Sequence, residues 1–259
     1  MTFRQTLQET TNAFALGYQL AKAHFKVRNE GSYLGVFWYL LEPLAFFIVL
    51  LFLGGVIYNN SIPQYPAYLL LGLIMFNFFL AVTGNASGII IKNKYFVKSI
   101  KVDSAAFIFA GVLQSIFSHI FEVALFIFLL IYLKTSVWLI IFYPVIFICL
   151  CLFTTGVAFI FAAVGVFVID WGNVWNVAGR LIWFVTPVFY VLRDSNSLIA
   201  KFNYFNPLSH FITVARNIIV YGEVPTIFSV LGIIVISFGT FLVGYFIFNK
   251  GKIYFAERV

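Results

Sequence analysis

Six long apolar runs constrain the fold of this chain more than any other feature of its 259 residues. A helix needs about 20 mostly apolar residues to cross the hydrocarbon core of a bilayer, and each run meets or nearly meets that length. The runs are residues 36–58, 66–91, 105–133, 137–169, 174–192 and 227–249. Only 10% of the residues are charged, whereas a soluble domain averages about 25%. The sequence therefore predicts an all-α, polytopic membrane protein with six transmembrane helices.

Lysine and arginine are concentrated on one side of this six-span topology. Of the 16 such residues, those on that side are Arg4, Lys22, Lys26, Arg28, Lys92, Lys94, Lys98, Lys101, Arg180, Lys250, Lys252 and Arg258. Positively charged loops stay in the cytoplasm, so both termini are predicted to be cytoplasmic, which requires an even number of spans. The net charge of +7 is then a bias of the loops. No nucleic-acid partner is expected, because no basic soluble domain is present to bind one.

Residues 1–35 precede the first span and are predicted to contain an amphipathic helix. Its apolar positions recur at spacings of four, three and four residues: Phe14, Tyr18, Ala21 and Phe25. Lys22 and Lys26 lie off that stripe. A helix of this kind can lie in the membrane interface. It would either anchor the first span or contact a partner or a lipid head group.

Residues 92–104 form a loop that is more apolar than its position requires. The loop reads KNKYFVKSIKVDS, and its central residues are Lys94, Tyr95, Phe96 and Lys98. Membrane orientation accounts for the lysines but not for Phe96. A short helix with an apolar face and a basic rim suits docking into a groove on another protein. We therefore expect this loop to be a helical contact site for a partner.

Residues 193–226 are too polar to span a membrane and too apolar for a plain loop. Asn206 followed by Pro207 predicts a helix start, so residues 198–221 should form two short helices joined at that point. The second would rise only about 21 Å, which is too short for a hydrocarbon core of about 30 Å. We expect its apolar face to lie against the spans. Its polar face, with Ser209, Thr213 and Arg216, is expected to face water or a pore mouth.

The third span carries a polar face that contains Ser115, Ser118, His119 and Glu122. Charged groups in a span are costly and normally face the bundle interior or a water-filled cavity. His119 and Glu122 are three residues apart on one helix and can pair. A packed interior pair or a polar pore lining is favoured over a proton relay. Glu42, Asp170 and Arg180 are expected near the ends of their spans.

The sequence offers no means of using ATP. It lacks the phosphate-binding pattern G-x-x-x-x-G-K-[ST], because Gly251-Lys252 is followed by Ile253. It also shows no His/Cys metal cluster and no nucleophile–base pair. We expect no enzymatic activity, no metal and no cofactor in this chain. If the protein pumps, a partner subunit must bind and hydrolyse ATP.

Residues 26–43, KVRNEGSYLGVFWYLLEP, resemble the signature that opens the membrane subunits of type-2 ABC exporters of polysaccharides. In that family a basic segment leads into G-S-x-L-G, then a Trp and, a few residues on, a Pro. The matching positions are Arg28, Gly31, Ser32, Leu34, Gly35, Trp38 and Pro43. The chain departs from the pattern at Asn29-Glu30, where an aromatic and a second basic residue are usual, and at Ile169, where an Arg is common.

Three further stretches agree with the family in the right order. They are Asp170 with Thr186-Pro187-Val188-Phe189-Tyr190, Asn206-Pro207-Leu208 with Arg216 and Gly222, and Phe255-Ala256-Glu257. The resemblance covers nearly the whole chain and is strongest to permeases that export O-antigen, capsule or teichoic acid. It implies a single transmembrane domain over residues 1–259. Residues 36–192 would hold spans one to five, residues 227–249 the sixth span, and residues 250–259 a cytoplasmic tail.

The resemblance also implies partners and a cargo. Such permeases are homodimers in the bacterial inner membrane, and two copies of a cytoplasmic ABC ATPase subunit bind ATP for them. The implied cargo is an undecaprenyl-pyrophosphate-linked glycan, which would enter from the lipid beside Lys22, Lys26 and Arg28. Residues 92–104 would couple the chain to the ATPase. Residues 193–226 would form the outer gate, whose site residues are Pro187, Tyr190, Asn206, Pro207 and Arg216.

Two other functions fit the sequence. One is a type-2 ABC permease for a small drug or a lipid, which would share the fold but need a closed apolar pocket. The other is an ion- or proton-coupled carrier that uses His119 and Glu122 and works without an ATPase. A polysaccharide channel, by contrast, needs a continuous aromatic and polar lining.

Overall fold

A computed structural model describes residues 3–29, 33–58, 62–99, 103–192 and 197–258 of the chain. The helices are α1 (Phe3–Asn29), α2 (Trp38–Tyr58), α3 (Tyr65–Ala86), α4 (Ile89–Lys92), α5 (Lys94–Ser99), α6 (Ala105–Tyr132), α7 (Tyr143–Phe167), α8 (Trp171–Val185), α9 (Leu198–Phe205), α10 (Pro207–Ile219), α11 (Ile227–Gly251) and α12 (Phe255–Arg258). Short 3-10 turns cover Gly35–Phe37, Val137–Phe142 and Lys252–Tyr254. Every regular element in these ranges is helical, which confirms the predicted all-α class. Gly31, Ser32, Lys101 and Arg193 lie outside the described residues, as do the side chains of Arg4 and Arg28.

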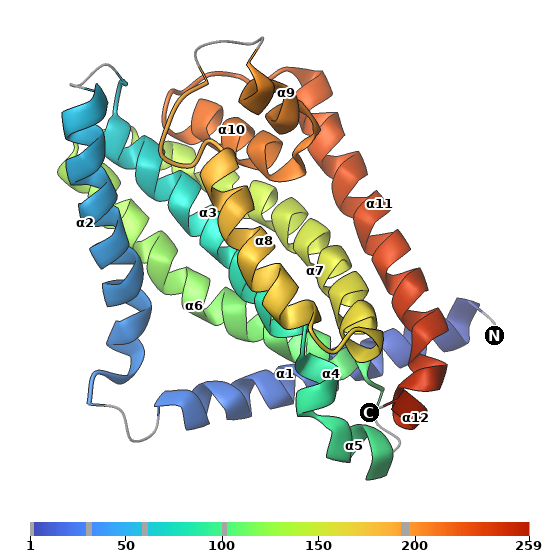
Figure 1. Ribbon diagram of the computed structural model, residues 1–259. Helices are drawn as coiled ribbons and strands as arrows, with labels where there is room; N and C mark the ends of the chain where they lie inside the picture. Colours follow the sequence, from blue (N-terminus) through green and yellow to red (C-terminus); the bar gives the residue numbers. More distant parts are fainter. Residues whose placement is uncertain (1–2, 30–32, 59–61, 100–102, 193–196, 259) are drawn as a thin grey trace.

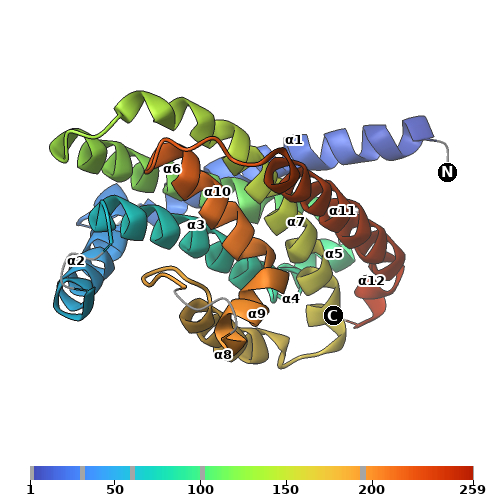
Figure 2. The same cartoon turned by 90° about the horizontal axis from the view of Figure 1, so that it is seen from above.

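The chain passes back and forth between the two ends of a helical bundle (Figure 1). Helices α2, α3, α6, α7, α8 and α11 run between the ends. Helices α1, α4, α5 and α12 lie at one end, where both termini are found, whereas α9 and α10 lie at the other. Seen from above, α2 stands at the edge of the bundle, and α3 and α7 occupy its middle (Figure 2).

Within the described residues, five helices are long and apolar enough to cross a membrane: Trp38–Ile57, Tyr65–Ala86, Ala105–Tyr132, Val137–Phe167 and Ile227–Tyr254. These correspond to five of the six predicted spans, with ends that differ by a few residues. The third predicted run, 105–133, agrees with α6 to within one residue. The second ends earlier than predicted, because a turn at residues 87–88 separates α3 from α4.

The predicted fifth span, residues 174–192, is wrong in its bounds. Helix α8 begins earlier, at Trp171, and has only 15 residues, so it rises about 22 Å. It ends at Val185 because Thr186 precedes Pro187 and adopts an extended conformation, with φ −74° and ψ 135°. A residue before proline is driven out of the α region by the proline ring. The apolar residues that follow are therefore not helical, although α8 still connects the two ends of the bundle (Figure 1).

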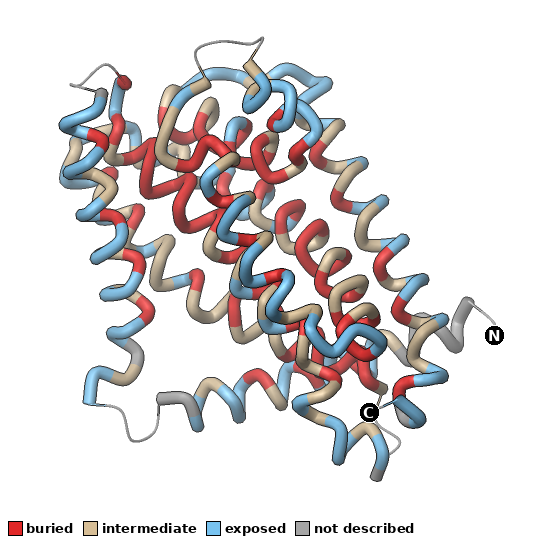
Figure 3. The backbone as a smooth tube through the Cα atoms, in the orientation of Figure 1, coloured by how far each residue is buried: buried red, intermediate tan, exposed pale blue. Residues whose placement is uncertain are grey.

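Helix α3 forms the centre of the core. Most of its residues are buried (Figure 3), and it contacts α2, α6, α7, α8 and α10. Its sequence is apolar on all sides, as expected of a helix that is surrounded by other helices. The outer helices α2 and α11 instead have few buried residues, which leaves broad apolar surfaces for lipid or another chain.

Helices α7 and α11 pack through glycine. A Cβ atom on Gly244 would lie 2.0 Å from the carbonyl oxygen of Gly156, and one on Gly156 would lie 2.4 Å from the carbonyl oxygen of Thr240. No side chain fits between the two backbones. Small residues permit this close approach, which is a common way for helices to associate in membranes.

The predicted amphipathic helix is confirmed as α1, which lies across one end of the bundle and packs on α6. The predicted apolar stripe is only partly correct. Its buried positions are Ala13, Gly17 and Ala21, spaced four residues apart, whereas Phe14 and Tyr18 are about half exposed. The small residues form the contact because they let α1 approach α6 closely. The larger aromatic side chains border that contact.

Candidate transport pathway and gate

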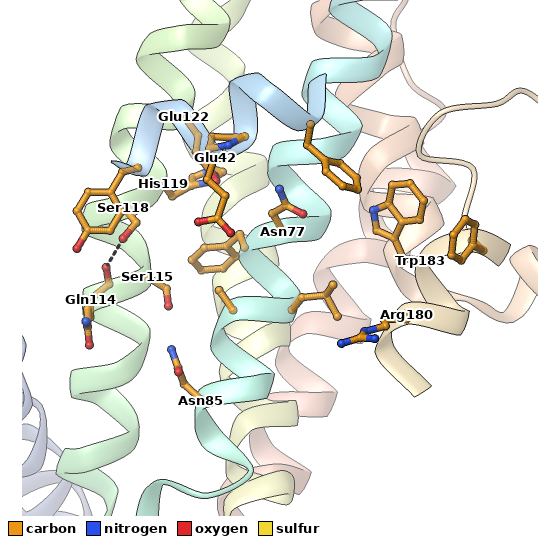
Figure 4. Close-up of a pocket in the computed structure, with 17 residues that line it drawn as sticks. Glu42, Asn77, Asn85, Gln114, Ser115, Ser118, His119, Glu122, Arg180 and Trp183 are labelled. Carbon is orange, nitrogen blue, oxygen red and sulfur yellow. Dashed lines mark hydrogen bonds and ion pairs between the residues drawn. The ribbon is translucent and has the colours of Figure 1, made fainter. Parts of the chain in front are cut away.

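A cavity of about 560 Å³ lies between α2, α3, α6 and α8 (Figure 4). Its lining residues are Tyr39, Glu42, Pro43, Phe46, Asn77, Phe78, Leu80, Ala81, Asn85, Gln114, Ser115, Ser118, His119, Glu122, Arg180, Trp183 and Phe184. Several of these side chains, including Glu42, Phe46 and Phe184, are exposed. The cavity of a single chain is therefore open to its surroundings. Pockets of this size hold small ligands or segments of larger ones.

The predicted polar face of the third span forms one wall of this cavity. Ser115, Ser118, His119 and Glu122 all line it. The imidazole Nδ1 of His119 lies 2.8 Å from a carboxylate oxygen of Glu122, so the predicted pair forms. Nε2 of His119 lies 2.7 Å from the hydroxyl of Tyr143 on α7. The pair is therefore part of a three-residue network.

Hydrogen-bonding chemistry assigns the direction of each contact in this network. When Glu122 is ionised its carboxylate can only accept, and Nδ1 of His119 then donates to it. The buried hydroxyl of Tyr143 then donates to Nε2, which is the acceptor that the described residues offer it. His119 is 2% exposed and stacks on Phe147 at 4.4 Å between ring centres. Both ring nitrogens of His119 therefore have partners inside the protein. Glu122 is the residue of the network whose carboxylate faces the cavity.

The charged residues of the cavity lie on different walls. Glu42 of α2 and Glu122 of α6 are near each other, whereas Arg180 of α8 lies on the other side (Figure 4). Arg180 is the tenth of the 15 residues of α8, so it lies part-way along that helix rather than near the end of a span as predicted, and its side chain is exposed. The carboxamides of Asn77, Asn85 and Gln114 add uncharged donors and acceptors to the lining.

Aromatic rings make up much of the remaining surface. Phe46 and Trp183 meet edge to face across the cavity, with ring centres 5.7 Å apart. Trp183 also contacts Phe184 at 4.9 Å. Aromatic side chains supply flat apolar faces of large area at low conformational cost. Beside carboxylates and carboxamides, they form the kind of surface that binds sugar rings, which have apolar C–H faces and hydroxyl edges.

The predicted entrance residues lie beside this cavity. The ring of Phe25 on α1 stacks on Tyr39, a lining residue, at 5.8 Å between ring centres. Lys22 and Lys26, within one turn of Phe25, are both exposed. Arg28 belongs to the last turn of α1, but its side chain lies outside the described residues. Helix α1 thus brings the positive charges of Lys22 and Lys26 close to the wall of the cavity.

At the opposite end, the two predicted short helices are confirmed as α9 and α10, and the break between them falls at Asn206-Pro207. Asn206 caps α10: its side-chain oxygen accepts a hydrogen bond from the backbone N–H of Leu208 at 3.1 Å. The predicted apolar face of α10 is buried. The polar face is not fully exposed as predicted, since Ser209 is buried and donates to the carbonyl of Asn203 at 2.6 Å. Thr213 is exposed.

Arg216 corrects the prediction most clearly. It was expected to face water or the pore mouth, but it is only 3% exposed. Its guanidinium donates to the carbonyl oxygens of Tyr68 at 3.0 Å, Pro187 at 2.7 Å and Val188 at 2.6 Å. Burial lowers the pKa of Arg216 to about 10, so the side chain stays charged at neutral pH.

These contacts explain why non-helical backbone is tolerated after α8. Pro187 ends the helix, so the carbonyls of the following residues lose their helical partners, and unpaired polar groups are costly at membrane depth. Besides Arg216, the hydroxyl of Tyr65 donates to the carbonyl of Phe189 at 2.9 Å, and that of Tyr68 to the carbonyl of Tyr190 at 2.8 Å. The Tyr190 hydroxyl donates to Val185. Three of the predicted gate residues, Pro187, Tyr190 and Arg216, therefore belong to one hydrogen-bonded unit.

The profile of the ABC-2 type transporter family matches residues 17–220, which is more than half of the chain. The chain belongs to this family. The match includes α2 to α8, the cavity that α2, α3, α6 and α8 line, and the two short helices α9 and α10.

Three similar proteins each carry the name O-antigen export system permease protein RfbA. Two are from Klebsiella pneumoniae, with 28% identity over 256 residues and 26% over 253 residues. A third, from Myxococcus xanthus, is 22% identical over 246 residues. The alignments cover 93–94% of this chain and 94–95% of the relatives. The similarity therefore runs from end to end rather than through one motif.

In an ABC-2 transporter the membrane chain works with an ABC ATPase, and α5 offers a surface for such a partner. The predicted helical loop is confirmed as α5, with Tyr95 and Phe96 74% and 52% exposed. Lys94 and Lys98 are exposed beside them. The ring of Phe96 also lies 6.3 Å from Phe107 at the start of α6. The partly packed ring fixes α5 on the bundle while leaving its apolar edge accessible.

Several residues that line the cavity were not identified from the sequence: Asn77, Asn85, Gln114 and Trp183. Asn77 and Asn85 occur singly in an otherwise apolar run, and Gln114 lies one residue before the predicted polar face. Eight residues separate the two asparagines, which places both on a similar side of α3. That spacing was the available signal, and it needed the neighbouring helices to show which side faced the cavity.

Proposed function

We propose that this chain is the membrane-spanning permease subunit of an ABC exporter that moves O-antigen-like polysaccharide out of the cytoplasm. The observation that carries the proposal is the cavity between α2, α3, α6 and α8, which combines aromatic faces with carboxylates and carboxamides. That lining suits sugar rings. End-to-end similarity to permeases named for O-antigen export supports the same cargo class.

The cavity suggests a paired arrangement. In one chain it is open beside α2 and α8, and exposed apolar side chains such as Phe46 and Phe184 flank it. A second copy packed against this side would enclose the cavity and double its lining. We therefore propose a homodimer in the bacterial inner membrane, with a channel along the shared face and both termini in the cytoplasm.

The basic end of the bundle suggests how the cargo arrives. Lys22 and Lys26 are exposed on α1, next to the ring contact that joins α1 to the cavity wall. Basic residues near a membrane surface attract anionic head groups, each contributing about 1 kcal/mol. We propose that they, with Arg28, attract the pyrophosphate of an undecaprenyl-linked glycan. ATP would be bound by two partner subunits docked on α5.

The alternatives are less well supported. A site for a small drug or a lipid would be a closed apolar pocket, whereas this cavity is open to its surroundings in a single chain and carries the carboxylates of Glu42 and Glu122 and a histidine network. A proton-coupled carrier would need a continuous relay through the bundle. In the described part of the chain the network joins Glu122, His119 and Tyr143 and goes no further.

The experiment is complementation. A host strain that makes an undecaprenyl-linked O-polysaccharide but lacks its own permease and ATPase receives this chain with its partner ATPase. Surface polysaccharide should appear, and it should be lost when the ATPase carries an inactivating substitution. A complex that assembles in the membrane but delivers no polysaccharide would refute the proposed function. Export that persists with the inactive ATPase would favour a carrier.

A further inference from the structure

The charges of the cavity are unequal, and their inequality bears on which polymers can pass. Of the charged groups that line it, Glu42 and Glu122 carry carboxylates and Arg180 carries the guanidinium. Glu42 and Glu122 lie on the same side, and Arg180 lies apart from them on α8 (Figure 4). One cation therefore stands against two anions. A second copy of the chain would bring the same excess, so pairing would not cancel it.

His119 does not correct this imbalance. Its Nδ1 is 2.8 Å from Glu122 and its Nε2 is 2.7 Å from Tyr143, so neither ring nitrogen is left to meet an anionic ligand. The ring is also covered by Phe147 and Phe78, at 4.4 Å and 5.3 Å between ring centres. His119 is a positioning residue that holds the carboxylate of Glu122 at the cavity wall. The group that a passing polymer meets is that carboxylate.

The remaining polar lining is uncharged. Asn77, Asn85, Gln114 and the two serines can accept hydrogen bonds from hydroxyl groups and donate to ring or glycosidic oxygens. Carboxylates are strong acceptors for hydroxyl donors. An uncharged glycan can form hydrogen bonds with such a surface at every repeat. A polymer with a uronate or a phosphodiester in each repeat would instead bring an anion past two carboxylates, in a site where water no longer screens them fully.

We propose that this cavity selects uncharged, hydroxyl-rich glycans and disfavours polymers that carry an anionic group in every repeat, with Glu42 and Glu122 as the specificity-determining residues. The inference rests on the proposed function, since it names the substrate class of the same site. A terminal pyrophosphate does not conflict with it, because that group occurs once per chain. Discrimination of this kind works by repelling the wrong partner.

The test compares two polymers in the complementation host described above. Both are built on undecaprenyl pyrophosphate with the same backbone, and they differ in that one carries a neutral hexose where the other carries the corresponding uronic acid. Export of each is measured as surface polymer per amount of permease in the membrane. The wild-type chain should export the neutral polymer about tenfold more than the acidic one.

Two single variants, their combination and a control test which residues cause the selectivity. Glu42→Gln leaves the His119 network intact, and Glu122→Gln keeps an oxygen that accepts from Nδ1 of His119. Each should raise the acidic-to-neutral export ratio severalfold, and together they should raise it further. The matched control is Glu223→Gln, an exposed carboxylate outside the cavity, which should leave the ratio unchanged. Because each ratio is taken within one variant, lower membrane levels do not affect it.

The outcomes separate the two proposals. Equal export of both polymers by the wild-type chain would overturn the selectivity while leaving the exporter intact. An unchanged ratio in both cavity variants would overturn the role of the two carboxylates. Export of neither polymer by an assembled complex would overturn the proposed function, and the selectivity with it.

Discussion

The guanidinium carbon of Arg216 lies 3.4 Å from the centre of the Tyr68 ring. The two residues belong to α10, one of the two short helices at one end of the bundle, and to α3, the central helix of the core. A guanidinium over an aromatic face is attracted by the ring, and the attraction is larger where water is excluded. Together with three bonds to backbone carbonyls, this contact fixes α10 and the segment after α8 to the core. Arg216 is therefore a latch between α10 and the core rather than a surface residue.

Replacement of Arg216 tests this latch. Arg216→Lys keeps the positive charge but loses the planar fork that reaches several carbonyls. It should lower the free energy of unfolding by about 2 kcal/mol, and Arg216→Met by more, because buried carbonyls would lose their donors. Thermal unfolding of the purified protein in detergent measures both. Lys201→Met, which removes an exposed cation from α9, is the control and should change stability by less than about 0.5 kcal/mol.

Gly72 provides an independent test of the same latch. A Cβ atom at this position would lie 2.2 Å from a terminal nitrogen of Arg216 and 3.1 Å from the carbonyl oxygen of Val188. The guanidinium cannot move aside without breaking its hydrogen bonds, so Gly72→Ala should destabilise the protein by about 1–3 kcal/mol. Gly84→Ala, on the same helix, meets nothing within 4 Å and should be neutral or slightly stabilising. Equal melting temperatures for the two variants would contradict the latch.

The sequence predicted the parts of the gate that depend on neighbouring residues. Asn206 and Pro207 mark a helix start because an N-cap and a proline at the first helical position act locally. The burial of Arg216 could not be predicted in this way. Its acceptors are carbonyls 28, 29 and 148 residues away in the chain, and two of them are available only because Pro187 ends α8.

The cavity, too, was only partly predictable from the sequence. The polar face of α6 was predicted, because polar side chains at helical spacing in a span must avoid lipid. The opposite wall was not, since Arg180 was placed near the end of a longer span and the spacing of the α3 asparagines did not show which helices they face. Which face of α3 lines a cavity depends on how α2 and α8 pack against it. This packing is a tertiary interaction, which the sequence of α3 alone does not show.

The exposed edge of α5 predicts a dependence on Phe96. Phe96→Asp should reduce co-purification of the ATPase partner by about tenfold or more, because it places a charge in an apolar contact. Phe205→Asp is the matched control, since Phe205 is an 82% exposed phenylalanine at the other end of the bundle. It should leave co-purification unchanged. Because Phe96 also touches Phe107, the melting temperature of each variant is measured alongside. Full ATPase recovery with Phe96→Asp would exclude α5 as the docking site.

Chemical labelling tests the placement of the two ends of the bundle. In a background with Cys149→Ala and Cys151→Ala, a cysteine is introduced at Thr213, Ser209 or Lys94 and exposed to a membrane-impermeant maleimide. Thr213→Cys on α10 should be labelled in intact cells, because the side chain is exposed at the end that we assign to the outside. Lys94→Cys on α5 should be labelled only when the cytoplasmic face is open, as in inverted vesicles.

Ser209→Cys separates the structure from simple amphipathic reasoning. Both Ser209 and Thr213 lie on the polar face of α10 in the sequence pattern, but Ser209 is 5% exposed and its hydroxyl is bonded to the carbonyl of Asn203. It should therefore react far more slowly than Thr213→Cys from either side. Equal labelling of the two positions would show that α10 turns a different face to the core. Labelling of Thr213→Cys only from the cytoplasmic side would instead reverse the orientation of the bundle and, with it, the direction of export.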